Sequence, residues 1–266
     1  MIPTLQFLPP AVIIDRVALL LGELELRLAH PQPAAADIHK IRVCSKKLRS
    51  WIRLLRHRHS ANHWRHTDRA IKKILCKLAP ARDSVVLRQT IEQLQTGTRS
   101  ARNRAACRQV LASLPTPEPV TSATGRAALS KRVVRELLDV GGPAGKTLQK
   151  GVQLACARSV RLARRAFTGE CSTASLHRLR RWVKYLGYQL ELVTLPTPAS
   201  EKFRKQLVSL GRILGRIHDF AVLQQLLGTN VNPHPAAAAL VAVQATRLQR
   251  RLLQQAEKQA RTVLAF

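Results

Sequence analysis

A stripe of basic side chains is the feature of this sequence with the clearest chemistry. It lies between Ala34 and Arg58, where basic residues are spaced alternately three and four positions apart, which places them on one face of a helix. They are His39, Arg42, Lys46, Arg49, Arg53 and Arg56. At about 1.5 Å of rise per residue, the stripe would be roughly 25 Å long. Arginine offers planar forks of donors to phosphate oxygens and lysine offers mobile point charges, so the stripe predicts binding of an extended anion.

The opening of this stripe recurs in the second half of the chain. The same spacing joins a histidine, an arginine and a lysine, and a further arginine stands beside them. These residues are His177, Arg180, Lys184 and Arg181. The second stripe is shorter than the first, because Gly187 stands where the first has Arg49. Most runs of charge are solvated helix faces, but a single sign of charge and a recurrence in both halves favour a binding surface.

The two histidines that open the stripes, His39 and His177, have a predicted role of their own. A neutral imidazole can donate to a phosphate oxygen, and nearby phosphate would raise its pKa, so binding would strengthen at mildly acid pH. The helices that follow each stripe add more cations to the predicted anion-binding surface. These are Arg69, Lys72 and Lys73 in the first half and Lys205 and Arg212 in the second.

The elements that must position these side chains are predicted to be helices throughout. Segments between the proline and glycine breaks have helical periodicity, and none alternates with the period of two that is typical of a strand. We expect helices over 11–29, 34–58, 62–78, 83–114 (bent or broken near Gly97), 122–140, 146–166, 173–193, 200–214, from 219 onward and over 236–264. The sequence therefore predicts an all-α protein.

A second pair of landmarks supports an internal repeat. The string from Arg82 to Leu87 parallels the string from His218 to Leu223, with an aspartate in second place in both. The histidine pair is separated by 138 positions and the aspartate pair by 136, a difference that one loop can absorb. We therefore predict one domain over 1–266, built from two four-helix-bundle repeats, 1–141 and 142–266. A pseudo-two-fold axis would relate them, with a basic groove between them. Asp83 and Asp219 would each cap the N-terminus of a helix or pair with a basic neighbour.

The charge balance restricts the class of partner. The 45 lysines and arginines against 15 aspartates and glutamates give a formal net charge of +30, and a polyanion would relieve the self-repulsion of such a chain. Inorganic polyphosphate, nucleic acid and an anionic membrane surface are the candidates. Aromatic residues are 4% of the chain, too few for base-stacking platforms, so nucleic acid is expected to bind weakly and non-specifically at low salt. A membrane role is the weakest candidate, because the cations are spread over many helices and no apolar stretch approaches ~20 residues.

Catalytic, metal and cofactor chemistry find little support in the sequence. It contains neither a phosphate-binding loop nor a dinucleotide fingerprint, and its carboxylates are too sparse to hold the metal ions that phosphoanhydride hydrolysis needs. The histidines at 57, 59, 63 and 66 have helical ligand spacings, but Asp68 is the sole nearby carboxylate, so we interpret them as a helix end and a loop. The 5 cysteines form no CxxC pair and the N-terminus has no basic leader, which indicates reduced thiols in a cytoplasmic protein. We expect no enzyme activity, no metal and no cofactor.

Together these strings resemble the conserved-histidine α-helical domain family, known as CHAD. The resemblance rests on the repeated H-x-x-R opening of a basic helix, followed in each half by an (R/H)-D-x-x-V-L segment, and it covers almost the whole chain. It implies two four-helix repeats around a basic central surface that binds inorganic polyphosphate, with no established catalytic role. We therefore expect a non-enzymatic polyphosphate-binding protein in the cytoplasm or at polyphosphate granules. A non-specific nucleic-acid-binding protein and an accessory subunit of a phosphate-polymer-processing enzyme are the alternatives, and the sequence leaves the oligomeric state open.

Overall fold

The structure of the chain, a computed structural model, describes residues 6–30, 33–55, 61–115, 145–169, 171–194, 197–228 and 233–266. Side chains are described for these residues except 55, 61–67 and 145–147. The predicted helix over 122–140, and the part of the predicted second helix beyond 55, lie outside the described residues.

Helices make up almost all of the described chain. In the first half the elements are β1 (Gln6–Phe7), α1 (Pro10–Leu28), α2 (Ala35–Leu55), α3 (Ala61–Lys77), α4 (Ala79–Gly97) and α5 (Ala101–Ser113). In the second half they are α7 (Gly145–Thr168), α8 (Thr173–Gln189), the short 3₁₀ helix η1 (Leu190–Leu192), β2 (Val193–Thr194), α9 (Pro198–Leu227) and α10 (Pro235–Leu264). The prediction of an all-α protein is confirmed.

A small strand pair, which the sequence did not predict, joins the start of the described chain to the end of α8. β1 and β2 are antiparallel, with Gln6 opposite Thr194 and Phe7 opposite Val193. Strands of two residues are too short to carry a period-2 pattern, so periodicity could not reveal them. The helix expected over 173–193 ends earlier, at Gln189, because η1 and β2 occupy the residues that follow it.

Side-chain caps fix where the helices of the second half begin. At the start of α8, the Ser172 hydroxyl accepts a hydrogen bond of 3.2 Å from the backbone N–H of Ser175. At the start of α9, Thr197 and Ser200 form a capping box, and Pro198 occupies the first turn. These caps set the register of both helices and therefore the face on which each side chain lies.

The predicted start of the fourth helix was wrong. α4 begins at Ala79, so Asp83 lies inside the helix and does not cap it. Pro80 accounts for this start, because a proline is tolerated in the first turn of a helix but not in its interior, so α3 ends at Lys77 and a new helix follows. The predicted break near Gly97 is confirmed, since α4 ends at that residue.

The predicted break in the corresponding helix of the second half was also wrong. α9 runs without interruption from Pro198 to Leu227, across the expected stop at 214. Asp219 therefore lies in the helix interior and caps nothing. No proline follows Pro198 within α9, so nothing there divides the helix as Pro80 divides α3 from α4.

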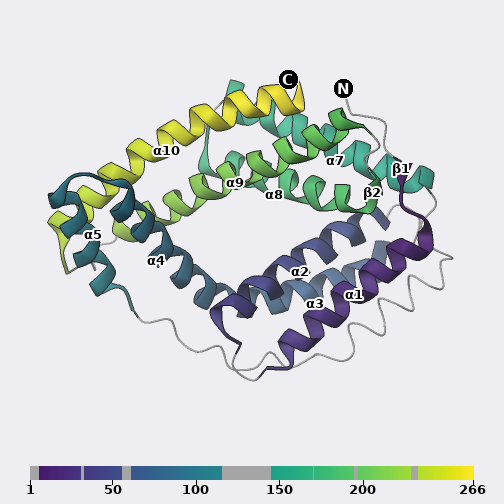
Figure 1. Cartoon of the computed structure of the whole chain (residues 1–266), viewed down its shortest axis with the longest axis horizontal. Coiled ribbons are helices and arrows are strands. Elements are labelled where there is room, and N and C mark those ends of the chain that lie inside the picture. Colours follow the sequence, from purple (N-terminus) through teal and green to yellow (C-terminus); the bar gives the residue numbers. More distant parts are fainter. Residues whose placement is uncertain are drawn as a thin grey trace.

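The helices are arranged so that corresponding parts of the two halves meet. Figure 1 shows α1, α2 and α3 on one side of the molecule, α7, α8 and α9 on the other, and α4 and α5 at one end. α2 lies against α8, α4 against α9, and α5 against α10. Two hydrogen bonds of 2.8 Å fasten α2 to α8, one from Ser50 Oγ to the Tyr185 carbonyl and one from Trp51 Nε1 to the Tyr188 carbonyl. Contacts between corresponding helices agree with a repeat, while the pseudo-two-fold axis and the boundary at 141–142 stay predictions.

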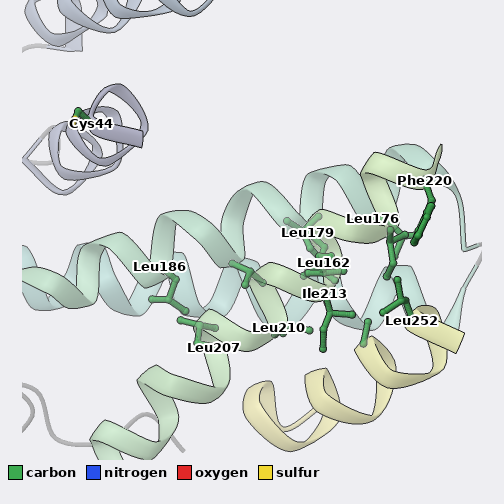
Figure 2. Packing of buried hydrophobic residues seen from close by; sticks show 14 of the residues in the cluster. Cys44, Leu162, Leu176, Leu179, Leu186, Leu207, Leu210, Ile213, Phe220 and Leu252 are labelled. Atoms are coloured by element: carbon green, nitrogen blue, oxygen red, sulfur yellow. The ribbon is translucent and has the colours of Figure 1, made fainter. Parts of the chain in front are cut away.

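A continuous apolar core holds these helices in place. Figure 2 shows its part around α8 and α9, where Leu186 and Leu179 of α8 lie close to Leu207 and Ile213 of α9. Leu252 of α10 belongs to the same cluster. Each fully buried leucine contributes about 1.5–3 kcal/mol relative to an exposed one. The core can therefore hold polar and charged side chains at fixed positions beside it.

Candidate anion-binding site

Four helices, two from each half, line one pocket. α2, α4, α8 and α9 enclose an empty volume of about 760 Å³, counted out to the open mouth. The cations that line it are Arg42, Lys46, Arg82, Arg180 and Lys184. The other polar side chains in its wall are His39, Asp83, Tyr188, His218 and Asp219. Five basic side chains therefore share the pocket with two carboxylates.

Lys46 and Lys184 are half-buried lysines at corresponding positions of α2 and α8. Burial, and then the neighbouring charges of Arg42 and Lys184, lower the pKa of Lys46 to about 7. Burial and the charge of Arg180 lower the pKa of Lys184 to about 8, although Asp219 acts in the opposite direction. Both ammonium groups are therefore destabilised in the free pocket, and a bound anion would favour their charged forms.

Three arginines enter the pocket from α2, α4 and α8, and burial lowers the pKa of each. Arg42 Nη1 donates to the Leu75 carbonyl at 3.4 Å. Arg82 Nη1 and Arg180 Nε are buried and have no hydrogen-bond partner among the described residues. A Cβ added at Gly215 of α9 would lie 3.7 Å from Arg180 Nε, an ordinary van der Waals distance, so α9 lies directly beside this guanidinium. Buried donors without acceptors cost free energy, so these two nitrogens indicate where oxygens of a bound anion would be stabilised.

The two aspartates moderate the positive field of the pocket without pairing closely with its cations. Asp83 is exposed and Asp219 is half-buried. Within the described structure, neither takes part in an ion pair. Burial raises the pKa of Asp219, while the charges of Arg180 and Arg82 act to lower it. The arginine donors are therefore not occupied by these carboxylates and stay available to an anion.

Three histidines stand in or beside the pocket. The rings of His177 on α8 and His218 on α9 have centroids 4.9 Å apart. Burial, and then the charges of Arg180 and His177, lower the pKa of His218 to about 4. Burial is also the largest cause that lowers the pKa of His39 and of His177. These imidazoles are therefore neutral near neutral pH in the free protein, and strengthening of binding at mildly acid pH stays a prediction.

The structure brings together the residues at the start of both predicted stripes. The predicted binding residues that line the pocket are His39, Arg42, Lys46, Arg180 and Lys184. His177 lies beside the pocket, against the ring of His218. The H-x-x-R-x-x-x-K pattern thus marks the side chains that converge.

The other predicted binding residues lie outside the pocket lining. Arg49 pairs with Asp68 of α3 through two hydrogen bonds, Nε to Oδ1 at 2.7 Å and Nη2 to Oδ2 at 3.1 Å. The guanidinium carbon of Arg53 lies 4.8 Å from the centre of the Tyr185 ring, a cation–π contact. The rest are exposed on α3, α8 and α9, namely Arg69, Lys72, Lys73, Arg181, Lys205 and Arg212. A contribution of these residues to binding stays a prediction.

Arg82, Tyr188 and His218 line the pocket but were not among the predicted binding residues. Arg82 and His218 directly precede Asp83 and Asp219, so their recurrence in both halves was a signal that could have identified them. Tyr188 stands four positions after Lys184 and therefore shares its face of α8. An aromatic ring at that spacing is more often part of a core, so sequence alone gave no reason to choose it.

The described part of the chain contains no group of three or more histidine, cysteine, aspartate and glutamate side chains that could hold a metal ion. Of the histidines at 57, 59, 63 and 66, the first two lie outside the described residues, and the side chains of the other two are not described. No helix among the described residues has the length and apolarity needed to cross a membrane.

Comparison with known proteins identifies a family and a shared fold. The family model for the CHAD domain matches residues 14–228, which include every helix that lines the pocket. A solved structure, "Crystal structure of the CHAD domain from the plant Ricinus communis", is similar over 96% of this chain and 90% of that chain, with a TM-score of 0.62 and 18% identity. At that identity the likeness concerns the fold alone. No curated protein matches the chain.

Proposed function

The chain belongs to the CHAD-domain family, and from this premise we propose that the pocket between α2, α4, α8 and α9 binds inorganic polyphosphate without cleaving it. The observation that carries the proposal is the convergence of five cations, from both halves of the chain, on this pocket. Two buried donors there, Arg82 Nη1 and Arg180 Nε, lack acceptors among the described residues. Phosphate oxygens would accept from both, and their charge would relieve the repulsion among the cations.

A hollow next to the pocket supports a ligand that is long rather than compact. It lies between α4 and α9 and shares Arg82 and Asp219 with the pocket, and Arg216 adds a further cation to it. A linear phosphate polymer would extend from the pocket into this hollow. A single phosphate would use only part of the cations that the two spaces offer.

Binding without catalysis is the simplest role for this arrangement. Enzymes that cleave phosphoanhydrides usually hold metal ions with several carboxylates. The carboxylates of the pocket are Asp83 and Asp219, and five cations around them disfavour the binding of another cation. By binding the polymer, the protein would be held on polyphosphate in the cytoplasm or at granules. Release of phosphate from polyphosphate with added Mg²⁺ or Mn²⁺ would instead favour the role of a subunit that processes the polymer.

The experiment that tests the proposal measures the Kd of long-chain polyphosphate at near-physiological salt. Duplex DNA and single-stranded RNA of matched charge are the competitors. We expect polyphosphate to displace both, because nucleic acid would engage only the general positive field, which salt screens strongly. The variant Arg42→Ala/Lys46→Ala/Arg180→Ala/Lys184→Ala should lose most of the affinity for polyphosphate.

A matched control separates the pocket from the overall charge. The control variant removes four exposed arginines of α5 and α7, and so changes the net charge by the same amount: Arg102→Ala, Arg108→Ala, Arg161→Ala and Arg164→Ala. We expect it to bind polyphosphate nearly as tightly as the parent protein. Equal losses in the two variants, or equal competition by nucleic acid, would show that the field is diffuse and would contradict the proposal.

A further inference from the structure

A second hollow, between α8 and α9, opens directly beside the cationic pocket. It encloses an empty volume of about 660 Å³, counted out to its mouth, and it shares Lys184 and Tyr188 with the pocket. Val183 and Leu207 form part of its wall. We call this hollow the α8–α9 groove. Whatever anion occupies the pocket therefore has an adjoining space of different chemistry beside Lys184.

Gly187 leaves part of the α8–α9 groove open. A Cβ added at Gly187 would have no atom within 4 Å, so the space beside it is open. In the first half of the chain the corresponding residue is Arg49, whose guanidinium pairs with Asp68 across α2 and α3. Arg204 stands where the first half has Asp68 and pairs instead with Glu201 of its own helix, at 2.6 and 3.0 Å. An ion pair thus bridges the two helices in the first half, and its counterpart in the second half is absent.

The wall of the groove differs from the wall of the pocket. Val208 stands where the first half has Lys72, and 39% of its surface is exposed. Val183 and Leu207 also line the groove but are almost fully buried, so Val208 is the exposed aliphatic side chain of this wall. Arg212, which is an exposed cation, lies on the same wall. A solvent-accessible apolar surface beside an anion pocket indicates a ligand with an apolar part and a charged part.

We propose that the α8–α9 groove holds the nucleoside of a nucleoside polyphosphate whose phosphates occupy the cationic pocket. The inference rests on the anion binding of the proposed function. The flat faces of a base would cover the apolar wall, and the polar groups of a nucleoside would meet the ring hydroxyl of Tyr188 and the guanidinium of Arg212. Lys184, which lines both spaces, would contact a phosphate near the nucleoside. A bare phosphate chain would gain nothing from the apolar wall.

The experiment compares ATP with inorganic tripolyphosphate, which has the same number of phosphates and carries more negative charge when fully ionised. Isothermal titration calorimetry at constant salt gives both Kd values. Charge alone would make tripolyphosphate the tighter ligand. We expect ATP to bind about tenfold more tightly, because burial of part of the base in the groove outweighs the difference in charge.

A pair of variants at one position tests where the base lies. Gly187→Leu places a branched side chain in the groove, while Gly187→Ala adds a single methyl group. Leucine and alanine are better helix formers than glycine, so α8 is expected to form in each variant. We expect Gly187→Leu to abolish the preference for ATP and to change the Kd of tripolyphosphate by less than about twofold. Gly187→Ala should keep most of the preference.

The possible outcomes separate this inference from the proposed function. If the parent protein binds ATP no more tightly than tripolyphosphate, or if Gly187→Leu weakens both ligands equally, the nucleoside does not lie in the groove. Polyphosphate binding in the pocket could still hold in that case. If the variant lacking Arg42, Lys46, Arg180 and Lys184 side chains binds tripolyphosphate as the parent does, the proposed function itself fails.

Discussion

Lys46 on α2 and Lys184 on α8 occupy the same position of the repeated pattern and line the same pocket. Burial is the largest cause that lowers the pKa of both lysines. The charges of Arg42 and Lys184 lower the pKa of Lys46 further, and the charges of Arg180 and Arg82 lower that of Lys184. In the free pocket, the ammonium groups of Lys46 and Lys184 therefore hold their protons weakly near neutral pH. Binding of an anion should strengthen that hold, so binding and protonation are coupled.

We expect polyphosphate binding to weaken as the pH rises from 7 to 9. The pKa of Lys46 is lowered to about 7 and that of Lys184 to about 8, so both side chains lose their charge over this range in the free protein. The anion binds the protonated forms better, so the Kd should increase with pH and protons should be taken up on binding. Long-chain polymer is the suitable ligand, because its internal phosphates do not titrate in this range.

The variant Lys46→Arg/Lys184→Arg is the matched control for this pH dependence. Guanidinium groups stay protonated even when burial lowers their pKa. The double variant should therefore bind with a nearly constant Kd between pH 7 and 9. A slope as steep as that of the parent would show that other groups cause the dependence. The remaining titratable groups that line the pocket are His39, Arg42, Arg82, Asp83, Arg180, Tyr188, His218 and Asp219.

Stability of the free protein should rise over the same pH range. The pKa of Lys46 is about 7 in the folded protein against an ordinary value of 10.5, so above pH 7 the unfolded chain binds more protons than the folded one. The free energy of unfolding then increases with pH. Burial raises the pKa of the Cys44 thiol from 9.0 to about 11, which acts in the opposite direction above pH 9 and limits the window. Urea denaturation at several pH values measures the slope.

A variant that lacks both lysine ammonium groups is the comparison for this pH dependence of stability. Lys46→Met/Lys184→Met keeps much of the side-chain volume and removes both charges, so it should be more stable than the parent at pH 7. Its free energy of unfolding should depend less on pH between 7 and 9. Lower stability of this double variant at pH 7 would contradict the view that the free pocket is under electrostatic repulsion.

Asp219→Asn should tighten polyphosphate binding severalfold. Asp219 is half-buried among the cations of the pocket and repels an incoming anion. Asp83 is exposed, where solvent screens its charge more strongly, so Asp83→Asn should have the smaller effect. Fluorescence anisotropy with labelled polyphosphate would measure both Kd values. Weaker binding by Asp219→Asn would instead assign to this carboxylate a role in orienting the arginines.

Two glycine-to-alanine variants should change the free energy of unfolding in opposite directions. Gly22 lies exposed in α1 with no atom near an added Cβ, so Gly22→Ala should raise the free energy of unfolding by about 0.5–1 kcal/mol. A Cβ on Gly151 of α7 would lie 2.8 Å from Leu54 Cδ2 and 3.5 Å from Leu54 Cα. Gly151→Ala should therefore lower the free energy of unfolding by about 1–3 kcal/mol, because α7 packs closely on α2 there. Thermal and urea unfolding would test both, and a stabilising Gly151→Ala would show that Leu54 can move aside.

The amino-acid sequence by itself determined the helical fold and the faces on which the basic residues lie. Both depend on local spacing, because the period of the helix fixes which side chains share a face. The recurrence of His39, Arg42 and Lys46 as His177, Arg180 and Lys184 needs no structure to be seen. The break near Gly97 was likewise local, since glycine and the residues that follow it favour a helix end.

Only the tertiary structure decided which parts of those faces converge. Packing of α2 on α8 brings Lys46 and Lys184 to one pocket. Packing of α2 on α3 gives Arg49 a carboxylate partner, Asp68, that no spacing rule connects with it. Arg82 reaches the same pocket from α4, because that helix lies against α9. Burial, ion pairing and depressed lysine pKa values are consequences of contacts between distant segments, which the apolar core fixes and which local sequence spacing does not encode.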